Sequence, residues 1–242
     1  MRRIAITFIF AIFAFVASAQ EQTVAIAADE AVSVPKTDWL TAFNSIKIDG
    51  PMNVVLKEVA TPEEARITYN TKGNITSKFK FEVDRNGELV VSEKSDPKRT
   101  TVTDVQIYYN NVREVKIAHA KAEFENKIKR NLFDLTVSGG AIVSLDIDVL
   151  DADVECTGVS QLTLGGRSKY FTMRVSSAKV DCSKLSTVST TVNASHSSEV
   201  RIVASERLEA TTSTGAKLLY KGHPVILRNH TGIFGGDIID IN

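Results

Sequence analysis

The chain has 242 residues, and its 29 lysines and arginines balance 29 aspartates and glutamates, so its formal net charge at pH 7 is zero. A chain without excess positive charge has no electrostatic reason to bind nucleic acid or an anionic membrane surface. The length suits one elongated domain or two small globular ones.

The N-terminal segment has the pattern of a secretory signal peptide. Met1-Arg2-Arg3 is followed by an apolar run over residues 4–16, and Ala17-Ser18-Ala19 precedes Gln20. A positive start, an apolar core and a small-x-small end are typical of such peptides. The run is shorter than the roughly 20 apolar residues that span a bilayer. We predict a signal peptide over residues 1–19, cleavage between Ala19 and Gln20, and no integral membrane segment in the mature chain.

The next region changes character at Trp39. Residues 20–38 are rich in alanine, valine and acidic residues and have no period, so we predict a flexible tether there and one domain over residues 39–242. No segment of the mature chain is a convincing helix. Asn86-Gly87, between two alternating runs, is the strongest hairpin signal. The strands predicted before the repeats cover residues 43–48, 52–57, 65–69, 79–83, 89–91, 105–109 and 112–117.

A repeated segment between residues 134 and 224 dominates the sequence. Its anchor residues are separated by 19, 19, 19 and 18 positions, and each follows a short alternating segment and precedes a corner of small residues. A fixed period near 20 with alternation inside it predicts a solenoid of strands. Ala118-His119-Ala120 lies one period earlier and resembles a degenerate first coil. The anchors are Ser138, Thr157, Ser176, Ser195 and Ser213.

The alternation also predicts which side chains form the core. In stacked coils, equivalent residues lie about 4.8 Å apart. The positions three and one before each anchor are mostly apolar and should point inward, while the position between them points outward. Neighbouring coils provide the core, so the N-terminal hairpins and the tail over residues 225–242 should cap the ends. The inward set is Leu135, Val137, Val154, Cys156, Met173, Val175, Val192, Ala194, Ala210 and Thr212.

Three motifs carry a family resemblance. They are Phe43-x-x-Ile46-x-Ile48-x-Gly50, Gly87-x-Leu89-x-Val91 and Leu218-x-Tyr220-x-Gly222-x-Pro224, with Ser-Gly-x-Ser-like corners between the last two. Together they resemble the putative auto-transporter adhesin, head GIN domain family, from Phe43 to the C-terminus. The resemblance implies an exported protein typical of Bacteroidetes-like bacteria, folded as a single right-handed parallel β-helix with coils of about 19 residues. Ser177 and His196 depart from the family pattern, because glycine is usual there.

The anchors themselves allow two interpretations. Small hydroxyl side chains bind backbone groups at tight corners, which makes them structural. A strip of hydroxyls that binds a sugar is the alternative.

No catalytic, cofactor-binding or metal-binding residues are predicted. His119 and His196 share one corner position but lie four coils apart, roughly 19 Å at the strand spacing. One zinc ion with ligands about 2 Å away cannot bind both. The serines lack the strand–turn–helix elbow of a hydrolase nucleophile, and Gly165-Gly166 is interpreted as a turn rather than a phosphate loop.

Two sets of carboxylates have the residue type needed for a glycosidase or a calcium site. Asp134 and Asp153 stack four positions before their anchors, but the next coils offer Thr172 and then Val188 or Ser189. The later coils therefore add no acidic residue to this pair, whereas glycoside hydrolysis requires two carboxyl groups about 5–9.5 Å apart, one of them with a raised pKa.

Two further acidic features remain. Glu155 is predicted to form a surface ion pair with Arg174. The acidic patch from Asp146 to Asp153 lacks the loop spacing of a known calcium site, so calcium binding there stays open.

The two cysteines, Cys156 and Cys182, are expected to be buried free thiols. Export permits a disulfide, but a bridge requires Cα atoms within about 7 Å. Cys182 points inward only if the repeat contains a one-residue gap, so the pairing also stays open.

The sequence therefore predicts an exported, non-enzymatic β-helix that recognises a glycan or protein partner, in the periplasm, on the outer surface or secreted. A polysaccharide lyase or glycosidase on the same fold is one alternative. A structural envelope protein without a specific ligand is the other.

Overall fold

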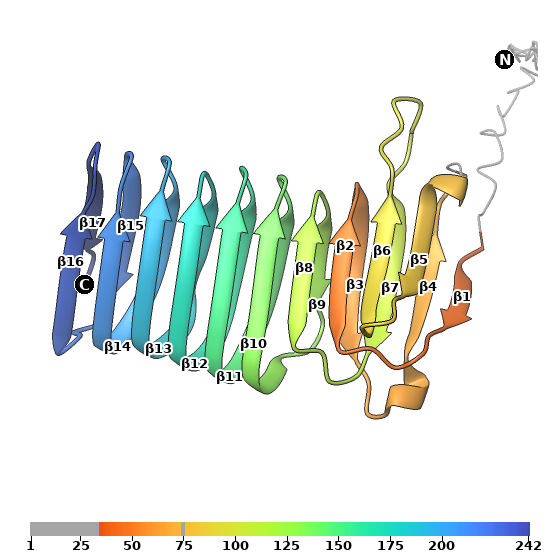
Figure 1. The fold of residues 1–242 in the computed structure, drawn as a ribbon, viewed down its shortest axis with the longest axis horizontal. Helices are drawn as coiled ribbons and strands as arrows, with labels where there is room; N and C mark the ends of the chain where they lie inside the picture. The colour runs from red at the N-terminus through yellow and green to blue at the C-terminus, as the bar shows by residue number, and fades with distance from the viewer. Residues whose placement is uncertain (1–33, 74–75) are drawn as a thin grey trace, which may run out of the picture. The chain divides into compact units, whose positions relative to one another are not determined.

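A computed structural model describes residues 34–73 and 76–242. These residues form 17 strands of one continuous sheet and two short 3-10 helices, which confirms the all-β prediction (Figure 1). Among them, no helix is long and apolar enough to cross a membrane. The elements are β1 Lys36–Trp39, β2 Ser45–Asp49, β3 Met52–Glu58, η1 Pro62–Glu64, β4 Arg66–Asn70, η2 Thr76–Lys78, β5 Phe79–Val83, β6 Glu88–Glu93, β7 Thr103–Tyr109, β8 Glu114–Ala118, β9 Lys121–Phe124, β10 Ile128–Ser138, β11 Ile142–Thr157, β12 Gln161–Ser176, β13 Lys179–Ser195, β14 Glu199–Thr212, β15 Ala216–Lys221, β16 Ile226–Thr231 and β17 Gly236–Asp240.

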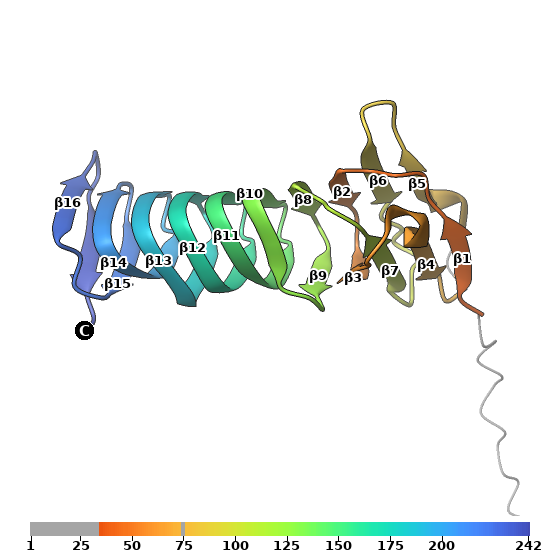
Figure 2. The same cartoon turned by 90° about the horizontal axis from the view of Figure 1, so that it is seen from below.

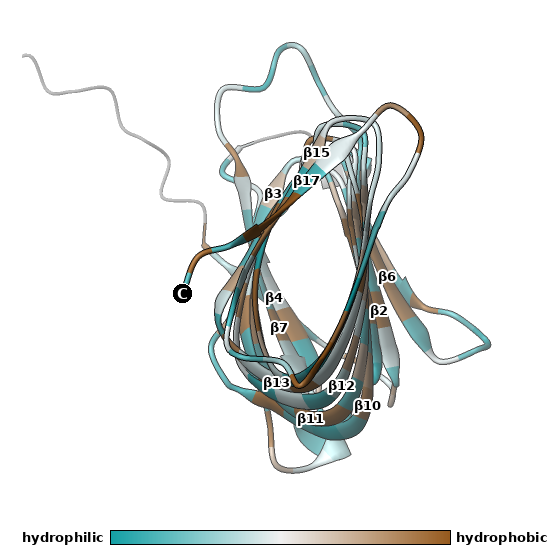
Figure 3. Cartoon of the chain, turned by 90° about the vertical axis from the view of Figure 1, so that its left-hand side faces the viewer, coloured by the Kyte–Doolittle hydropathy of each residue, from teal (hydrophilic) through white to brown (hydrophobic). Residues whose placement is uncertain are grey.

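The strands wind into a right-handed parallel β-helix. Seen end-on, the coils superimpose as a flattened ring with two walls (Figure 3). From β11 to β13, one long strand of 16 or 17 residues rounds an edge of the ring and contributes to both walls (Figure 2). The predicted register is confirmed: Thr157 pairs with Ser176, and Ser176 pairs with Ser195.

The coils do not stack in chain order at the N-terminal end. The coil of β2 and β3 lies between the coil of β6 and β7 on one side and the coil of β8 and β9 on the other. Ile46, for example, pairs with both Leu89 and Val115. The chain therefore forms one coil, leaves it to build the cap, and returns to add coils on both sides of the first. The coil around Ala118 does precede the coil of Ser138, as predicted.

Antiparallel strands cap this end. β5 pairs with β6 through the predicted Asn86-Gly87 hairpin, and β4 pairs with β7. β1 extends the second wall by pairing with β4, so the sheet begins at Lys36 rather than at Trp39. The rest of the predicted tether, up to residue 33, and the signal peptide lie outside the described residues.

The core follows the predicted alternation. Every residue of the inward set is at most 2% exposed, whereas Thr136, Glu155 and Arg174 face solvent. The smallest side chain of the first ladder, that of Ala210, lies at its C-terminal end. The side chains that point inward from both walls form one contiguous core, and each coil covers the apolar face of its neighbour.

The tail after Pro224 forms one more coil. β16 pairs in parallel with β14, and β17 pairs with β15. Its interior positions mix apolar residues such as Leu227 and Ile238 with polar ones such as Asn229 and Asp240. The Tyr220 hydroxyl donates to Asp240 Oδ2 over 3.4 Å. Polar contacts therefore replace part of the apolar packing at this end of the core.

The corners require left-handed backbone. The residue after each anchor has a positive φ whether or not it is glycine, with 55° at Ser177 and 53° at His196. These two departures from the family pattern therefore keep the corner conformation with non-glycine residues, at a conformational penalty of roughly 1–2 kcal/mol each.

Both cysteines are buried free thiols, as predicted. The one-residue gap is also present and lies at the corner before β13: Thr157 pairs with Ser176, 19 residues on, but Gln161 pairs with Lys179, only 18 residues on. This shorter corner turns Cys182 inward. Gly165-Gly166 is not a turn. It lies inside β12, beside Asp146 and Ile147 of the preceding coil.

Candidate ligand-binding cavity at the N-terminal end

The cap brings three aromatic rings together between the two walls. Tyr69 of β4 pairs with Val105, and Phe81 of β5 pairs with Val91. Since both valines are buried, the paired aromatic side chains also face the interior. Tyr69, Phe79 and Phe81 have ring centroids 4.9, 5.5 and 5.9 Å apart. They form an aromatic cluster at the mouth of the solenoid.

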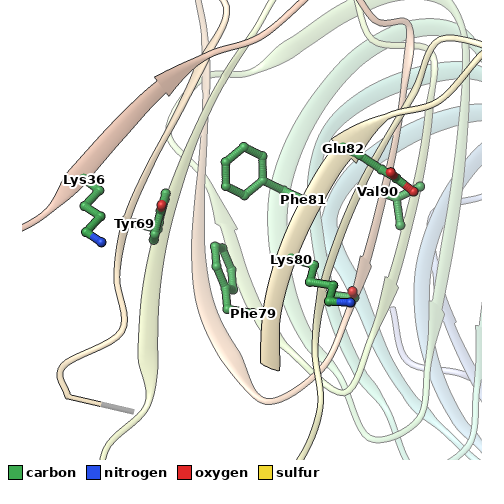
Figure 4. A pocket seen from close by; sticks show the side chains of 8 residues that line it. Lys36, Tyr69, Phe79, Lys80, Phe81, Glu82 and Val90 are labelled. Atoms are coloured by element: carbon green, nitrogen blue, oxygen red, sulfur yellow. The ribbon is translucent and has the colours of Figure 1, made fainter. Parts of the chain in front are cut away.

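A cavity of about 480 Å³ opens on this cluster (Figure 4). Tyr69 and Phe81 are half-buried, and Phe79 is 6% exposed at its floor. Figure 4 shows the three rings on the side of β5 that faces β1 and β4, with Lys80 and Glu82 on the other side. The full lining is Lys36, Tyr69, Phe79, Lys80, Phe81, Glu82, Val90 and Ser92.

Charged groups also line this cavity. Lys36 comes from β1, where its register partner is Tyr69. Within the described part of the chain, Lys36, Lys80 and Glu82 form no ion pair. Their charged ends therefore remain available for a ligand at the rim.

The Tyr69 hydroxyl keeps its proton. Partial burial raises the pKa of Tyr69, and the neighbouring Asp38 carboxylate raises it further by charge and by accepting its hydrogen bond. The same hydrogen bond links Tyr69 to Asp38 of β1, and Tyr69 lines the cavity. The cavity can stack a flat apolar surface on aromatic rings and bond polar substituents at the rim.

The predicted anchors lie elsewhere, in one column along a corner of the solenoid. All five are half-buried. Ser195 Oγ donates to the Val175 carbonyl over 3.5 Å, and Ser176 Oγ lies 3.1 Å from His196 Nδ1. A hollow of about 320 Å³ beside this column is lined by Val159, Ser177 and His196 but by no anchor. These contacts favour the structural interpretation of the anchors.

The histidines are dispersed. His119 Nδ1 lies 2.9 Å from Asp49 Oδ1, and His196 contacts Ser195 of its own corner and Ser176 of the preceding coil. Three corners, at Gly139, Gly158 and Ser177, separate the two histidines in register. In the described residues, no group of three His, Cys, Asp or Glu side chains could hold a metal ion.

The acidic ladder differs from the prediction in two ways. Asp134 and Asp153 stack as expected, and Thr172 follows. The next residue is Thr191 rather than Val188 or Ser189, because the extra residue in β13 is absorbed by the shift near Gly165 and the later register stays intact. On the other side, Glu114 stacks on Asp134 and lengthens the row.

The arginines beside this row take different partners from those predicted. Arg174 Nη2 binds Asp153 at 2.7 Å, so the predicted pair with Glu155 is wrong. Asp148 of the acidic patch accepts two bonds from Arg167, at 2.6 and 2.8 Å. These bonds, and then the charge of the arginine, hold the pKa of Asp148 below its usual range.

Sequence patterns did not reveal the aromatic cavity. Tyr69, Phe79 and Phe81 fall in predicted strands, and alternation puts the two phenylalanines on one face. However, β4 and β5 are not sheet neighbours, since they pair with β7 and β6. Their meeting depends on the non-sequential coil order, for which a single sequence carries no local signal.

The fold and the cavity together define a parallel β-helix with a ligand-sized hollow in its cap. A family model, described as putative auto-transporter adhesin, head GIN domain, matches residues 42–224. The chain therefore belongs to that family, and it is an adhesin-like β-helix module. No curated protein matches the sequence.

Solved structures share the fold at low identity. A putative adhesin from Bacteroides fragilis aligns with a TM-score of 0.76 and 16% identity, over 86% of this chain and 96% of that one. A putative adhesin from Parabacteroides merdae aligns with a TM-score of 0.69 and 14% identity over the same shares. A putative lipid binding protein from Parabacteroides distasonis gives 0.66 and 15%, again over 86% and 96%.

Proposed function

We propose that this protein is an exported, non-enzymatic adhesin-like module that binds a glycan in the aromatic cavity of its cap. The observation that carries the proposal is the cluster of Tyr69, Phe79 and Phe81 on a cavity of about 480 Å³ with charged groups at its rim. Sugar rings have apolar C–H faces that stack on aromatic rings, and their hydroxyls bond to polar groups around the edge. The volume falls within the usual range for small-ligand sites.

Export is supported by the signal-peptide pattern of residues 1–19 and by membership in an adhesin family. The mature module would then act in the periplasm, at the outer surface or after secretion. A partner that reaches the open cap would meet the cavity directly, because the cavity lies beyond the coil of β6 and β7 at one end of the stack.

The arrangement of the carboxylates gives little support to the rival hypothesis of a polysaccharide-active enzyme. A cavity of about 390 Å³ gathers Asp84, Glu88 and Glu114 with two basic residues. Glu88 and Glu114 share Lys116, at 3.4 and 2.8 Å. Backbone hydrogen bonds from its own turn hold the pKa of Asp84 low. A glycosidase needs a carboxyl with a raised pKa opposite a second one, and each of these acids already has an internal partner.

Binding can be tested by glycan-array screening of the mature chain, followed by calorimetry with the best saccharide. Tyr69→Ala and Phe81→Ala should each weaken binding at least tenfold, because each removes part of the stacking surface. Tyr170→Ala, which removes a 47% exposed ring from the solenoid wall, is the matched control. Equal loss in the control, or unchanged affinity in both cavity variants, contradicts the proposal.

A lipid is the competing occupant. The Parabacteroides distasonis neighbour carries the words "lipid binding", but 15% identity supports the fold alone. Vesicle sedimentation with phosphatidylethanolamine liposomes should show no binding that depends on Tyr69. Sedimentation abolished by Tyr69→Ala, together with a blank glycan array, would replace the glycan with a lipid.

Catalysis is tested separately. We expect no release of reducing ends from polysaccharides. Release by the purified protein that disappears in Asp153→Asn would assign the acidic row to an enzyme.

A further inference from the structure

A second recess lies where the chain enters the strands β2, β8 and β10. It consists of a cavity of about 810 Å³ and the 390 Å³ cavity described above, which share Asn44 and Arg113 in their linings. No residue of this recess lines the aromatic cavity. We call it the corner groove. The larger part is lined by Asn44, Asn111, Arg113, Lys129, Arg130, Asn131, Leu132 and Asp148.

The backbone beneath the groove is fixed by hydrogen bonds between coils. The Asn44 amide donates to the Gly87 carbonyl over 3.0 Å, and the Arg113 amide donates to the Asn44 carbonyl over 3.0 Å. The Asp134 amide then donates to the Arg113 carbonyl over 2.9 Å. Asn44 and Arg113 are the residues just before β2 and β8, and these bonds tie both of them to the neighbouring coils, which holds binding residues in place.

The larger part of the groove has unbalanced positive charge. Arg130 pairs with Glu58, and Asp148 is held by Arg167. In contrast, Arg113 and Lys129 form no ion pair with any residue that the structure describes. Two cations thus face a hollow in which the one carboxylate is already neutralised. An anionic group is the ligand that this charge favours.

Three amides accompany these cations. Asn44, Asn111 and Asn131 are exposed, and within the described residues their side chains make no hydrogen bond. Each amide offers two donors and an acceptor, which matches hydroxyl groups that donate and accept at once. Asn111 is held in left-handed backbone with φ of 54°, so its position is set by the link between β7 and β8.

The smaller part of the groove carries the opposite charge. Three carboxylates, those of Asp84, Glu88 and Glu114, line it with only two cations, Arg113 and Lys116, and Lys116 pairs with the last two acids. An anionic group is repelled from this end and attracted to the other, so the charges give a bound ligand one orientation. Leu132 is the one apolar side chain in the lining of the larger cavity, which leaves no pocket for the side chains of a peptide.

We propose that the corner groove binds an acidic saccharide, with its carboxylate or sulfate at Arg113 and Lys129 and its hydroxyls on the asparagine amides. This site is independent of the aromatic cavity and of the function proposed for it. A charged sugar supplies both chemistries that the groove offers, whereas a simple anion uses only the cations.

Affinity electrophoresis and calorimetry of the mature chain test the proposal, with polygalacturonate, chondroitin sulfate and heparin as probes and dextran as the neutral comparison. At least one acidic probe should bind, and dextran should not. The double variant Arg113→Gln/Lys129→Gln should weaken binding at least tenfold and flatten its dependence on salt. The double variant Lys121→Gln/Lys217→Gln removes two exposed charges that do not line the groove and should bind normally.

The amides distinguish a saccharide from a bare anion. Asn44→Ala should weaken the binding of the acidic saccharide several-fold while leaving the salt dependence of binding unchanged. Sodium sulfate should compete only at concentrations far above those of the probe. Absence of binding to all three probes overturns the proposal, as does equal weakening by the Lys121/Lys217 variant. Tyr69→Ala should not change this binding, so failure of the aromatic site and failure of the corner groove are separable. Thermal melts verify that each variant is folded.

Discussion

Val154 and Met173 occupy the same register position on neighbouring coils, and neither side chain exposes any surface to solvent. Val154→Asp would therefore bury a charge without a partner. We expect a loss of several kcal/mol against a total stability of about 5–15 kcal/mol, measured by thermal or urea unfolding. Thr136→Asp is the control, because Thr136 lies on the outward face of the preceding coil. Equal damage by both variants would contradict the register.

The repeat makes the solenoid predictable because each coil has to bury an apolar face against its neighbours in the same way. Alternation places Val154 and Cys156 inside, and the period places them on Met173 and Val175. The first coils lack this information. Alternation predicts the strands at 43–48 and 52–57, but nothing in them specifies that the coil of β2 and β3 inserts between two coils that come later in the chain. That arrangement is set by long-range packing.

The candidate sites could not be predicted from the sequence either, because they too depend on long-range packing. Asn44 and Arg113 are 69 positions apart in sequence, yet a backbone hydrogen bond joins them. The acidic row shows a smaller failure of the same kind. Counting backward from Ser138 finds Asp134, but Glu114 joins the row only because a 20-residue interval separates β8 from β10.

Gly166 supports the close stacking of β11 and β12. Its φ is +99°, and a Cβ there would lie 2.0 Å from the Ile147 carbonyl oxygen. Gly166→Ala should therefore destabilise by more than the conformational penalty alone, roughly 3 kcal/mol or more in urea unfolding. Gly235→Ala is the matched control, with φ of +71° and nothing within 4 Å of the added atom. It should lose only about 1–2 kcal/mol. Similar losses at both positions would show that the contact with Ile147 is relieved without strain.

A buried ion pair lies in the cap. The Glu93 side chain is 2% exposed and accepts hydrogen bonds from Arg99 Nη2 at 3.0 Å and from Thr103 Oγ1 at 2.9 Å. Glu93→Ala leaves the Arg99 guanidinium without its carboxylate, so we expect a loss of about 3–5 kcal/mol in urea unfolding. Glu206→Ala, at an exposed position, should change stability by less than about 0.5 kcal/mol.

The double variant Glu93→Leu/Arg99→Met tests the cause of that loss. Replacing both charges with apolar side chains removes the uncompensated guanidinium, so most of the stability should return. A double variant no more stable than Glu93→Ala would assign the loss to packing instead.

Asp134 should make the protein less stable at neutral pH than in mild acid. Burial raises the pKa of its carboxyl, and the charges of Asp153 and Glu114 raise it further. The folded state then binds this proton more tightly than the unfolded state, so the contribution of Asp134 to stability falls as pH rises through the window between the two pKa values. Asp134→Asn should raise the stability at pH 7 by less than about 1 kcal/mol, because the site is largely exposed.

The pH dependence separates this effect from a change in packing. The gain from Asp134→Asn should vanish below the unfolded pKa of aspartate, near 4, where the native carboxyl is already protonated. Thermal melts between pH 3 and pH 8 measure it. A gain that persists unchanged at pH 3 would assign the effect to the amide itself.

The thiols of Cys156 and Cys182 should be unreactive in the folded protein. Burial raises the pKa of the Cys156 thiol to about 12 and raises that of Cys182 as well. Because the thiolate is the reactive form, Ellman's reagent at pH 8 should titrate no thiol in native protein and two per chain in denaturant without reductant. Ser197→Cys, at an exposed corner, should react within the mixing time. Native thiols that react as fast as this control would contradict their burial, and a count of zero in denaturant would mean that the two cysteines are bridged.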